Sequence, residues 1–403
     1  MINSKHLNLD QIYQYLLIAL AFVFPLTVAG GNLIISIIVL TWLLSGNYKA
    51  KFNQIISNKL AVLSILFFSL HVLGLLWTDD LKWGLTIVKK MSDFLFLLPI
   101  LLTITKKKYI KYYISAFILA MSLTEVLSYL VWFEIIDPLH KATVGNPTPT
   151  MSHISYNPYL AFGIYLITHE LLSNKSLSAI AKYFYAFFAL TMSINMFITG
   201  GRAGQVMFFA MITILIFQYY NPKRIKAAIL TMIIVPSIFM SAYSLSPQFN
   251  NRVNDAIDNI SSYNDEGKRD TSVGQRITYT LNSFKIIQQN PLFGVGTGDF
   301  PDEYKKVHMN NTPDVGLTVN PHNMYILTTV QLGVLGLASM LLIFYHQLKF
   351  ALSSKIGIVK DLGVVLPMLF LVIMWSDSYL LGHYTTILFV FFSSFLYKDF
   401  EKN

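Results

Sequence analysis

The sequence contains no cysteine among its 403 residues, so disulfide bonds and thiolate metal sites are both excluded. Charge is also scarce: Asp, Glu, Lys and Arg make up 13% of the chain, against about 25% in ordinary soluble proteins. Hydrophobic residues make up 54%, and the mean hydropathy is +0.53. Apolar runs of roughly 17–25 residues recur along the whole length, which is the pattern of a multi-pass helical membrane protein.

The net charge of +9 does not indicate a nucleic-acid partner. In a soluble protein such a charge would favour one, but here most basic residues lie in short loops between apolar runs. In that position they set the orientation of the chain in the lipid bilayer.

The apolar runs predict about twelve transmembrane helices in one integral membrane domain, 1–403. The first run follows Lys5 and could be a signal peptide, with a weak cleavage-like site at 27–29. We interpret it as a retained first span, because the topology below requires it. The predicted spans are 12–28, 31–45, 61–77, 91–105, 112–132, 154–172, 181–199, 203–219, 226–243, 322–348, 361–378 and 383–397.

The distribution of basic residues predicts that both termini are cytoplasmic. Of the 30 Lys and Arg residues, 18 then face the cytoplasm, five lie in short outer loops and seven lie in one long outer segment. The five in the outer loops are Lys82, Lys89, Lys90, Lys141 and Arg202. Long loops are largely exempt from the positive-inside rule, so the 18-to-5 ratio decides the orientation.

The long outer segment, 245–321, separates the ninth and tenth spans and is expected to carry part of the active site. Apolar residues at 249, 253, 257 and 260 predict a short amphipathic helix, and those at 273, 277, 281 and 284 predict a second. Three alternating glycines follow at 294, 296 and 298. Their spacing is not that of a dinucleotide fingerprint, so they indicate either a plain turn or a close approach to a ligand.

His322 stands where the insert re-enters the membrane. Asn320 is a plausible N-cap and Pro321 suits a first helical position, which places His322 in the first turn. A helix N-terminus disfavours added positive charge, so the imidazole is expected to be neutral and able to accept a proton. The alternative is a histidine that merely ends a helix at the lipid interface.

Two arginines are candidate anion ligands. Arg202 follows two glycines at a predicted helix start, where exposed N–H groups and a planar guanidinium suit phosphate oxygens. Arg276 shares a helix face with Tyr279 and Ser283. The alternatives are a snorkelling Arg202 and a solvated Arg276.

Other polar residues face the same side of the membrane. Asn323, His153 and Asp377 are possible substrate-binding residues. Asp79 and Asp80 could hold a divalent cation, but the chain has no spaced Asp-x-Asp pair.

Three short sequence motifs, in the order in which they occur, resemble those of the O-antigen ligase/polymerase superfamily. They are GRA at 201–203, Arg276 followed by NPLFGVG at 290–296, and His322-Asn323 before a helix with glycines at 333 and 336. NRVNDA at 251–256 and WSD at 375–377 are more similar to the O-antigen ligases within it. His383 departs from relatives that carry an arginine at that point, so the role of the last outer loop is open.

The resemblance implies a metal-independent glycosyltransferase of the bacterial inner membrane, with a periplasmic active site and no cofactor. An O-antigen ligase moves a glycan from undecaprenyl diphosphate to a sugar hydroxyl of lipid A–core oligosaccharide, with inversion at the anomeric carbon. By position, His322 matches the catalytic base, and Arg202 and Arg276 match the diphosphate ligands.

Two other functions remain open at this point. An O-antigen polymerase would use the same lipid-linked donor with a growing glycan as acceptor. A twelve-helix secondary transporter is a different class, but such carriers often show internal repeats, and many place their long loop between spans six and seven. Here the long loop follows span nine.

Overall fold

The computed structural model describes residues 8–140, 142–265 and 267–400, which form α-helices joined by turns and short 3-10 helices, with no β-strand in these ranges. Lys5, Lys141 and Lys402, which the topology prediction used, lie outside them. The α-helices are α1 (Leu9–Val23), α2 (Val28–Leu44), α3 (Tyr48–Ser57), α4 (Lys59–Leu73), α5 (Leu81–Leu95), α6 (Leu97–Ile104), α7 (Ile110–Trp132), α8 (His153–Ser173), α9 (Ala179–Ile198), α10 (Arg202–Tyr219), α11 (Arg224–Leu245), α12 (Pro247–Asp265), α13 (Ser272–Gln289), α14 (Phe300–Asn311), α15 (Met324–Ser353), α16 (Gly357–Ile373) and α17 (His383–Leu396). The 3-10 helices are η1 (Gly74–Trp77), η2 (Lys107–Tyr109) and η3 (Tyr379–Leu381).

Helices lie at all twelve predicted spans, but only six helical segments of the described chain are long and apolar enough to cross a bilayer alone. These are Lys59–Trp77, Lys107–Trp132, Ala179–Ile198, Arg202–Tyr219, Arg224–Leu245 and Met324–Ser353. A seventh span results if α2 and α3, bent by 118°, are counted as one broken helix. The predicted span 91–105 is divided between α5 and α6 at Phe96. The chain is a multi-pass helical membrane protein, and the number twelve stays a prediction.

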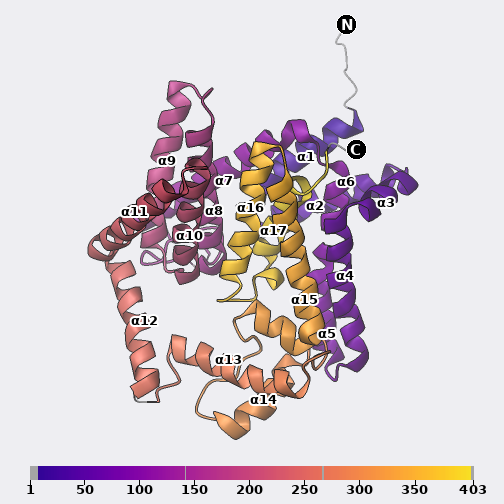
Figure 1. Cartoon of the computed structure of the whole chain (residues 1–403), viewed down its shortest axis with the longest axis vertical. Helices are drawn as coiled ribbons and strands as arrows, with labels where there is room; N and C mark the ends of the chain where they lie inside the picture. Colours follow the sequence, from indigo (N-terminus) through magenta and orange to yellow (C-terminus); the bar gives the residue numbers. More distant parts are fainter. Residues whose placement is uncertain (1–7, 141, 266, 401–403) are drawn as a thin grey trace.

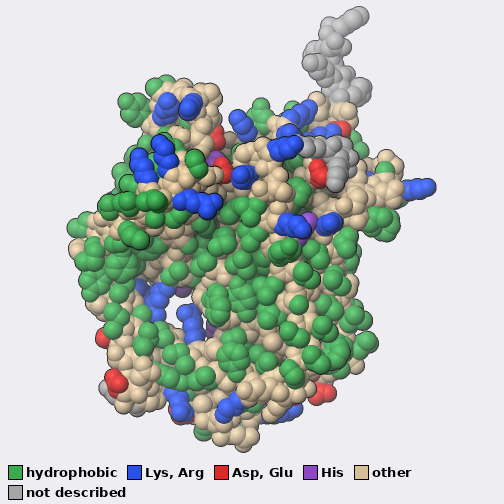
Figure 2. Space-filling model, viewed as in Figure 1, with side chains coloured by type: hydrophobic (Ala, Val, Ile, Leu, Met, Phe, Trp, Pro, Cys, Tyr) green, Lys and Arg blue, Asp and Glu red, His purple; other side chains and the backbone are tan. Residues whose placement is uncertain are grey.

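The surface has a broad hydrophobic band, and many Lys and Arg side chains gather at the end where both termini lie (Figures 1 and 2). Inside the band, aromatic rings from distant helices pack together. The Phe117 ring of α7 lies 5.8 Å from that of Tyr159 on α8 and 5.2 Å from that of Phe392 on α17. These rings are fully buried, so they join the N-terminal and C-terminal helices into one core.

The insert forms the end of the molecule opposite the termini (Figure 1). Both predicted amphipathic helices are present, as α12 and α13, and a third helix, α14, was not predicted. The apolar residues from which α13 was predicted do not form its buried face: Leu281 and Phe284 are about half exposed. The buried face carries Asn282 instead, whose Nδ2 donates to Thr312 Oγ1 at 2.8 Å. A hydrogen-bonded amide is buried there, which an apolar pattern does not reveal.

The helix α15 is broken at Gly333, where φ is +64° and ψ is −162°. A break inside a span leaves carbonyls without helical partners. The loop 290–298 supplies the donors: Val295 N–H binds Val330 O at 2.9 Å, and Gly296 N–H binds Gln331 O at 3.0 Å. In return, Pro291 O accepts from Val334 N–H at 2.9 Å. The alternating glycines therefore serve a close approach to backbone, and not a plain turn.

The same loop is anchored to the corner between α4 and α5 through Asp299. Its buried carboxylate accepts hydrogen bonds from the Thr78 hydroxyl and from the N–H groups of Asp79 and Asp80, at 2.5 to 2.9 Å. Asp80 in turn caps α5 by accepting from Trp83 N–H at 2.9 Å. Charge-assisted bonds of this kind are the stronger ones in proteins, so they fix the insert to the membrane helices.

Gly333→Ala should destabilise the protein, because a Cβ at this position would stand 2.1 Å from Leu292 O and an alanine would be held at positive φ. Left-handed backbone alone costs a non-glycine residue about 1–3 kcal/mol. The melting temperature in detergent should fall clearly. Gly316→Ala, where a Cβ meets nothing within 4 Å, is the control and should melt like the wild type. Equal melting temperatures for the two variants would contradict the close contact between the loop 290–298 and the break in α15.

Because the chain lacks cysteine, single cysteines can test which side each loop faces. Cysteines replacing Ser261 and Asn310 of the insert, both exposed, should react with an impermeant maleimide added to intact cells with a permeable outer membrane. Cysteines replacing Ser173 and Ser353, also exposed, should react only after the inner membrane is disrupted. Labelling at 173 in intact cells would refute the predicted orientation.

Candidate functional site

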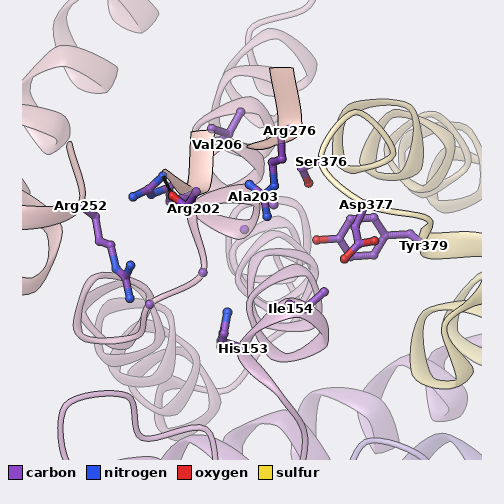
Figure 3. A pocket seen from close by; sticks show the side chains of 14 residues that line it. His153, Ile154, Arg202, Ala203, Val206, Arg252, Arg276, Ser376, Asp377 and Tyr379 are labelled. Carbon is purple, nitrogen blue, oxygen red and sulfur yellow. Dashed lines mark hydrogen bonds between the residues drawn. The ribbon is translucent and has the colours of Figure 1, made fainter. Parts of the chain in front are cut away.

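A cavity of about 290 Å³ lies between the insert and the membrane helices, and we call it the arginine cavity. Its walls come from the starts of α8 and α10, from α12 and α13, and from the segment that joins α16 to α17 (Figure 3). The side chains that carry chemistry there are His153, Arg202, Arg252, Arg276, Ser376, Asp377 and Tyr379. In Figure 2, Lys and Arg side chains surround an opening beside α12.

The glycines around Arg202 bring α10 very close to α8. A Cβ at Gly201 would stand 2.7 Å from Asn157 Cγ, and one at Gly204 would stand 2.1 Å from Asn157 Cβ. The amide of Asn157 donates from Nδ2 to Gly201 O at 3.3 Å. Only glycine permits this contact, and the contact fixes the helix start from which Arg202 projects into the cavity.

The three arginines of the cavity have few acidic partners. Arg202 lies 4.0 Å from Asp255 Oδ2, a distance at the outer limit of an ion pair, and 3.5 Å from the Ser272 hydroxyl. Arg252 and Arg276 make no hydrogen bond or ion pair with any residue of the described ranges. Three guanidinium groups around one cavity, with few ion-pair partners, are a candidate site for an anion, and their planar forks suit phosphate oxygens.

His153 lines the same cavity at the first residue of α8. Burial lowers its pKa, and the positive charges of Arg252 and Arg276 lower it further. Its Nδ1 lies 3.2 Å from Asn146 Nδ2. Since the ring is neutral at neutral pH, it offers hydrogen bonds to a ligand without adding charge. The structure therefore places His153 where a substrate-binding role was predicted, and that role stays a prediction.

The predicted helix start at Asn320 is wrong, because α15 begins after its N-cap, Asn323, which accepts from Ile326 N–H at 3.1 Å. His322 therefore precedes the helix and is not in its first turn. Asn320 Oδ1 accepts from His322 N–H at 3.0 Å, which closes a tight turn through Pro321. His322 has φ of +52°, a left-handed conformation that is uncommon outside glycine and is often found at functional sites.

A carboxylate and an aromatic ring position the imidazole of His322, in place of the helix dipole. Its Nδ1 is buried 3.3 Å from Asp377 Oδ1, at ion-pair distance but without the alignment of a good hydrogen bond. The ring stacks on Tyr279 of α13, with centroids 6.2 Å apart. The side chain is 36% exposed, and Nε2 has no protein partner among the described residues. That nitrogen is open to a substrate.

Asp377 is held as an ionised carboxylate. Burial raises its pKa, but the approach of His322 and hydrogen bonds from Ser378 N–H and Asn320 Nδ2, at 2.7 and 3.0 Å, lower the pKa more. The net shift is below the ordinary value of 3.8. A lowered folded-state pKa means that this stabilising contribution is complete at neutral pH and is lost only as pH falls through the lowered value.

The remaining predicted residues have structural partners. Asn323 is buried and does not line the arginine cavity. Its side-chain oxygen caps α15. Asp79 and Asp80 bind Asp299 through their main-chain N–H groups. Among the described residues, no group of three or more His, Cys, Asp or Glu side chains is arranged to hold a metal ion.

The family model of the O-antigen ligases matches residues 187–341, a segment that contains Arg202, Arg252, Arg276 and His322. This match supports the resemblance of the chain to the O-antigen ligase superfamily. This superfamily consists of ligases and polymerases of the glycosyltransferase type, which supports a general enzymatic role. A curated protein of Haemophilus influenzae, described as uncharacterized, is 25% identical over 363 residues, 85% of each chain.

Arg252 lines the cavity but was not among the residues predicted from the sequence. A signal was present: Arg252 lies three residues after Phe249, beside the apolar face of the predicted amphipathic helix. Phe249 is buried against the Phe197 ring, with centroids 5.1 Å apart, and this contact fixes where α12 leaves the membrane helices. Arg252 then lies one turn further along, at the cavity wall.

Replacing Arg276 or Arg252 with glutamine should weaken the binding of inorganic pyrophosphate by about 10- to 100-fold, since hydrogen bonds to charged groups contribute about 1.5–3 kcal/mol each. Lysine at either position keeps the charge but loses the fork, so a smaller loss is expected. Isothermal titration in detergent measures this. Arg269→Gln, in the same insert but outside the cavity, should bind like the wild type. Unchanged binding by all the cavity variants would refute an anion site here.

Proposed function

We propose that the protein is an O-antigen ligase, which transfers a glycan from undecaprenyl diphosphate to a sugar hydroxyl of lipid A–core oligosaccharide. The observation that carries the proposal is the position of the histidine–carboxylate pair beside three arginines. Asp377 lines the arginine cavity and contacts His322, so a proton acceptor and an anion site adjoin. The match of residues 187–341 to the O-antigen ligase family model supports the same reaction class.

The proposed reaction exchanges one bond at the anomeric carbon of the donor sugar. The acceptor hydroxyl oxygen attacks this carbon, its proton passes to Nε2 of His322, and the bond from the carbon to the diphosphate oxygen breaks. Undecaprenyl diphosphate leaves with the bonding electrons. Attack opposite the leaving group inverts the anomeric configuration. His322 acts as general base, and Asp377 orients the ring and stabilises the imidazolium that forms.

The arginines are assigned to the diphosphate. Arg202 and Arg276, with Arg252 added, hold the donor and stabilise the negative charge that grows on the leaving group. Because these fixed cations perform the task that a bound divalent metal performs in many glycosyltransferases, the proposed mechanism uses neither a metal ion nor a cofactor. Catalysis then rests on positioning and on electrostatics.

The proposed location is the bacterial inner membrane, with the arginine cavity facing the periplasm. The excess of Lys and Arg at the end that carries the termini supports this orientation through the positive-inside rule (Figure 2). The donor lipid would remain in the bilayer, and its diphosphate would enter the cavity at the level of the start of α10. Nothing in this arrangement requires a nucleic acid.

His322→Ala should reduce transfer by about 10²–10⁴-fold, the usual contribution of a general base, while donor binding stays nearly intact. Asp377→Asn should also lower the rate, because the ring loses its charged partner. A reconstituted assay with purified lipid-linked donor and core acceptor measures both. His383→Ala is the control. His383 is exposed and does not line the arginine cavity, so this variant should transfer normally. Normal transfer by a well-folded His322→Ala variant would contradict the assignment of the base.

The same proposal separates ligase from polymerase in the cell. Loss of a ligase leaves uncapped core while polymerised glycan accumulates on the lipid carrier. Loss of a polymerase leaves core capped with a single repeat. The second pattern in a deletion strain, corrected by the wild-type gene, would replace the ligase proposal with the polymerase.

A further inference from the structure

A second cavity, of about 270 Å³, adjoins the arginine cavity. The two share Ile154, Asp377 and Tyr379 as a common wall. The rest of the second cavity comes from α5, α8, α15, the residues around Asn320 and the segment 378–385, and no arginine lines it. Apart from the shared Asp377 and Tyr379, its polar lining comes from amides, hydroxyls and one lysine, Lys90, with the ring of Trp83 beside them. The charges of the two cavities therefore select different ligands.

Gln331 of α15 has an unsatisfied hydrogen-bonding group in this cavity. Its residue is 2% exposed, and its Nε2 is buried without a hydrogen-bond partner. Among the described residues that line either cavity, no other side chain leaves a buried polar atom unpaired. An unpaired buried donor costs about 1–3 kcal/mol, so a buried amide at a cavity wall points to a ligand that satisfies it.

The main chain of Gln331 is fixed by the break in α15. Gly296 N–H binds its carbonyl at 3.0 Å, and a Cβ at Gly294 would stand 2.4 Å from its carbonyl carbon. The glycine loop thus holds the backbone from which this amide projects. A group that is held rigidly and left unpaired is preorganised for binding.

We propose that the second cavity binds the acceptor sugar, and that Gln331 is the residue that positions it; this rests on the proposed function. A sugar ring presents many hydroxyls and little charge, which suits amides, hydroxyls and an aromatic ring better than a set of arginines. Asp377 lines both cavities and contacts His322. An acceptor hydroxyl in one cavity and a donor diphosphate in the other therefore meet beside the base.

The first test measures KM for each substrate with Gln331→Leu. One lost hydrogen bond should raise the KM for the core acceptor about three- to tenfold and leave the KM for the lipid-linked donor unchanged. Gln347→Leu is the matched control: Gln347 is a buried glutamine of the same helix that donates to Ser393 and lines neither cavity. Equal effects of the two variants on the acceptor KM, or a rise in the donor KM with Gln331→Leu, would overturn the assignment.

The second test measures binding without chemistry, with purified core oligosaccharide and the His322→Ala protein in nanodiscs. Adding Gln331→Leu should weaken binding of the core oligosaccharide about three- to tenfold. Ser155 lines the second cavity and is partly exposed. Ser155→Phe should abolish binding of the core oligosaccharide and leave pyrophosphate binding unchanged. This variant replaces Gln331→Leu in the test if Gln331→Leu does not fold. Core binding unaffected by either change would overturn the assignment. Core binding by the wild type without any transfer would refute the proposed reaction and leave the cavity assignment intact.

Discussion

The structure depends on satisfying the backbone at the break in α15. In a membrane span, each carbonyl and N–H group needs a protein partner, because hydrocarbon offers none. The break at Gly333 frees carbonyls, and the loop 290–298 pairs with those of Val330 and Gln331. A segment with no apolar pattern is thereby fixed to the membrane helices as firmly as a helix would be. Asp299 adds a second attachment at the corner of α4 and α5.

This attachment explains how the insert can keep its arginines close to Arg202 of the membrane helices. Repulsion between Arg202, Arg252 and Arg276 opposes their approach, and Asp255 offsets it only weakly at 4.0 Å. The approach is imposed by α12 and α13, which are held at their bases by buried aromatic contacts and by the glycine loop. The protein therefore sustains an electrostatic cost at this site. A bound anion such as a diphosphate would relieve this repulsion, which supports the proposed assignment of the arginines to the donor.

Much of the fold could be predicted from the sequence, since apolar runs located the helices and polar composition located the insert. The convergence of Arg202, Arg276 and Asp377 on one cavity follows from their placement on one side of the predicted membrane. The break at Gly333 could not be predicted, because a glycine inside an apolar run is common in membrane helices. The cap at Asn323, three residues after the predicted cap at Asn320, places His322 before the helix. The buried face of α13 was not predicted, because it carries the hydrogen-bonded Asn282, which an apolar pattern does not reveal.

The order of residues in the site constrains how the protein can be made. The wall shared by the two cavities includes Tyr379, and the partner of His322 is Asp377, both within the last 27 residues of a 403-residue chain. During synthesis, Arg202, Arg252 and Arg276 leave the ribosome long before that wall exists. A chain that stops between His322 and Asp377 would have the three arginines but not the carboxylate that contacts His322. Removal of Asp377 and Tyr379 would leave each of the two cavities without the wall that they share.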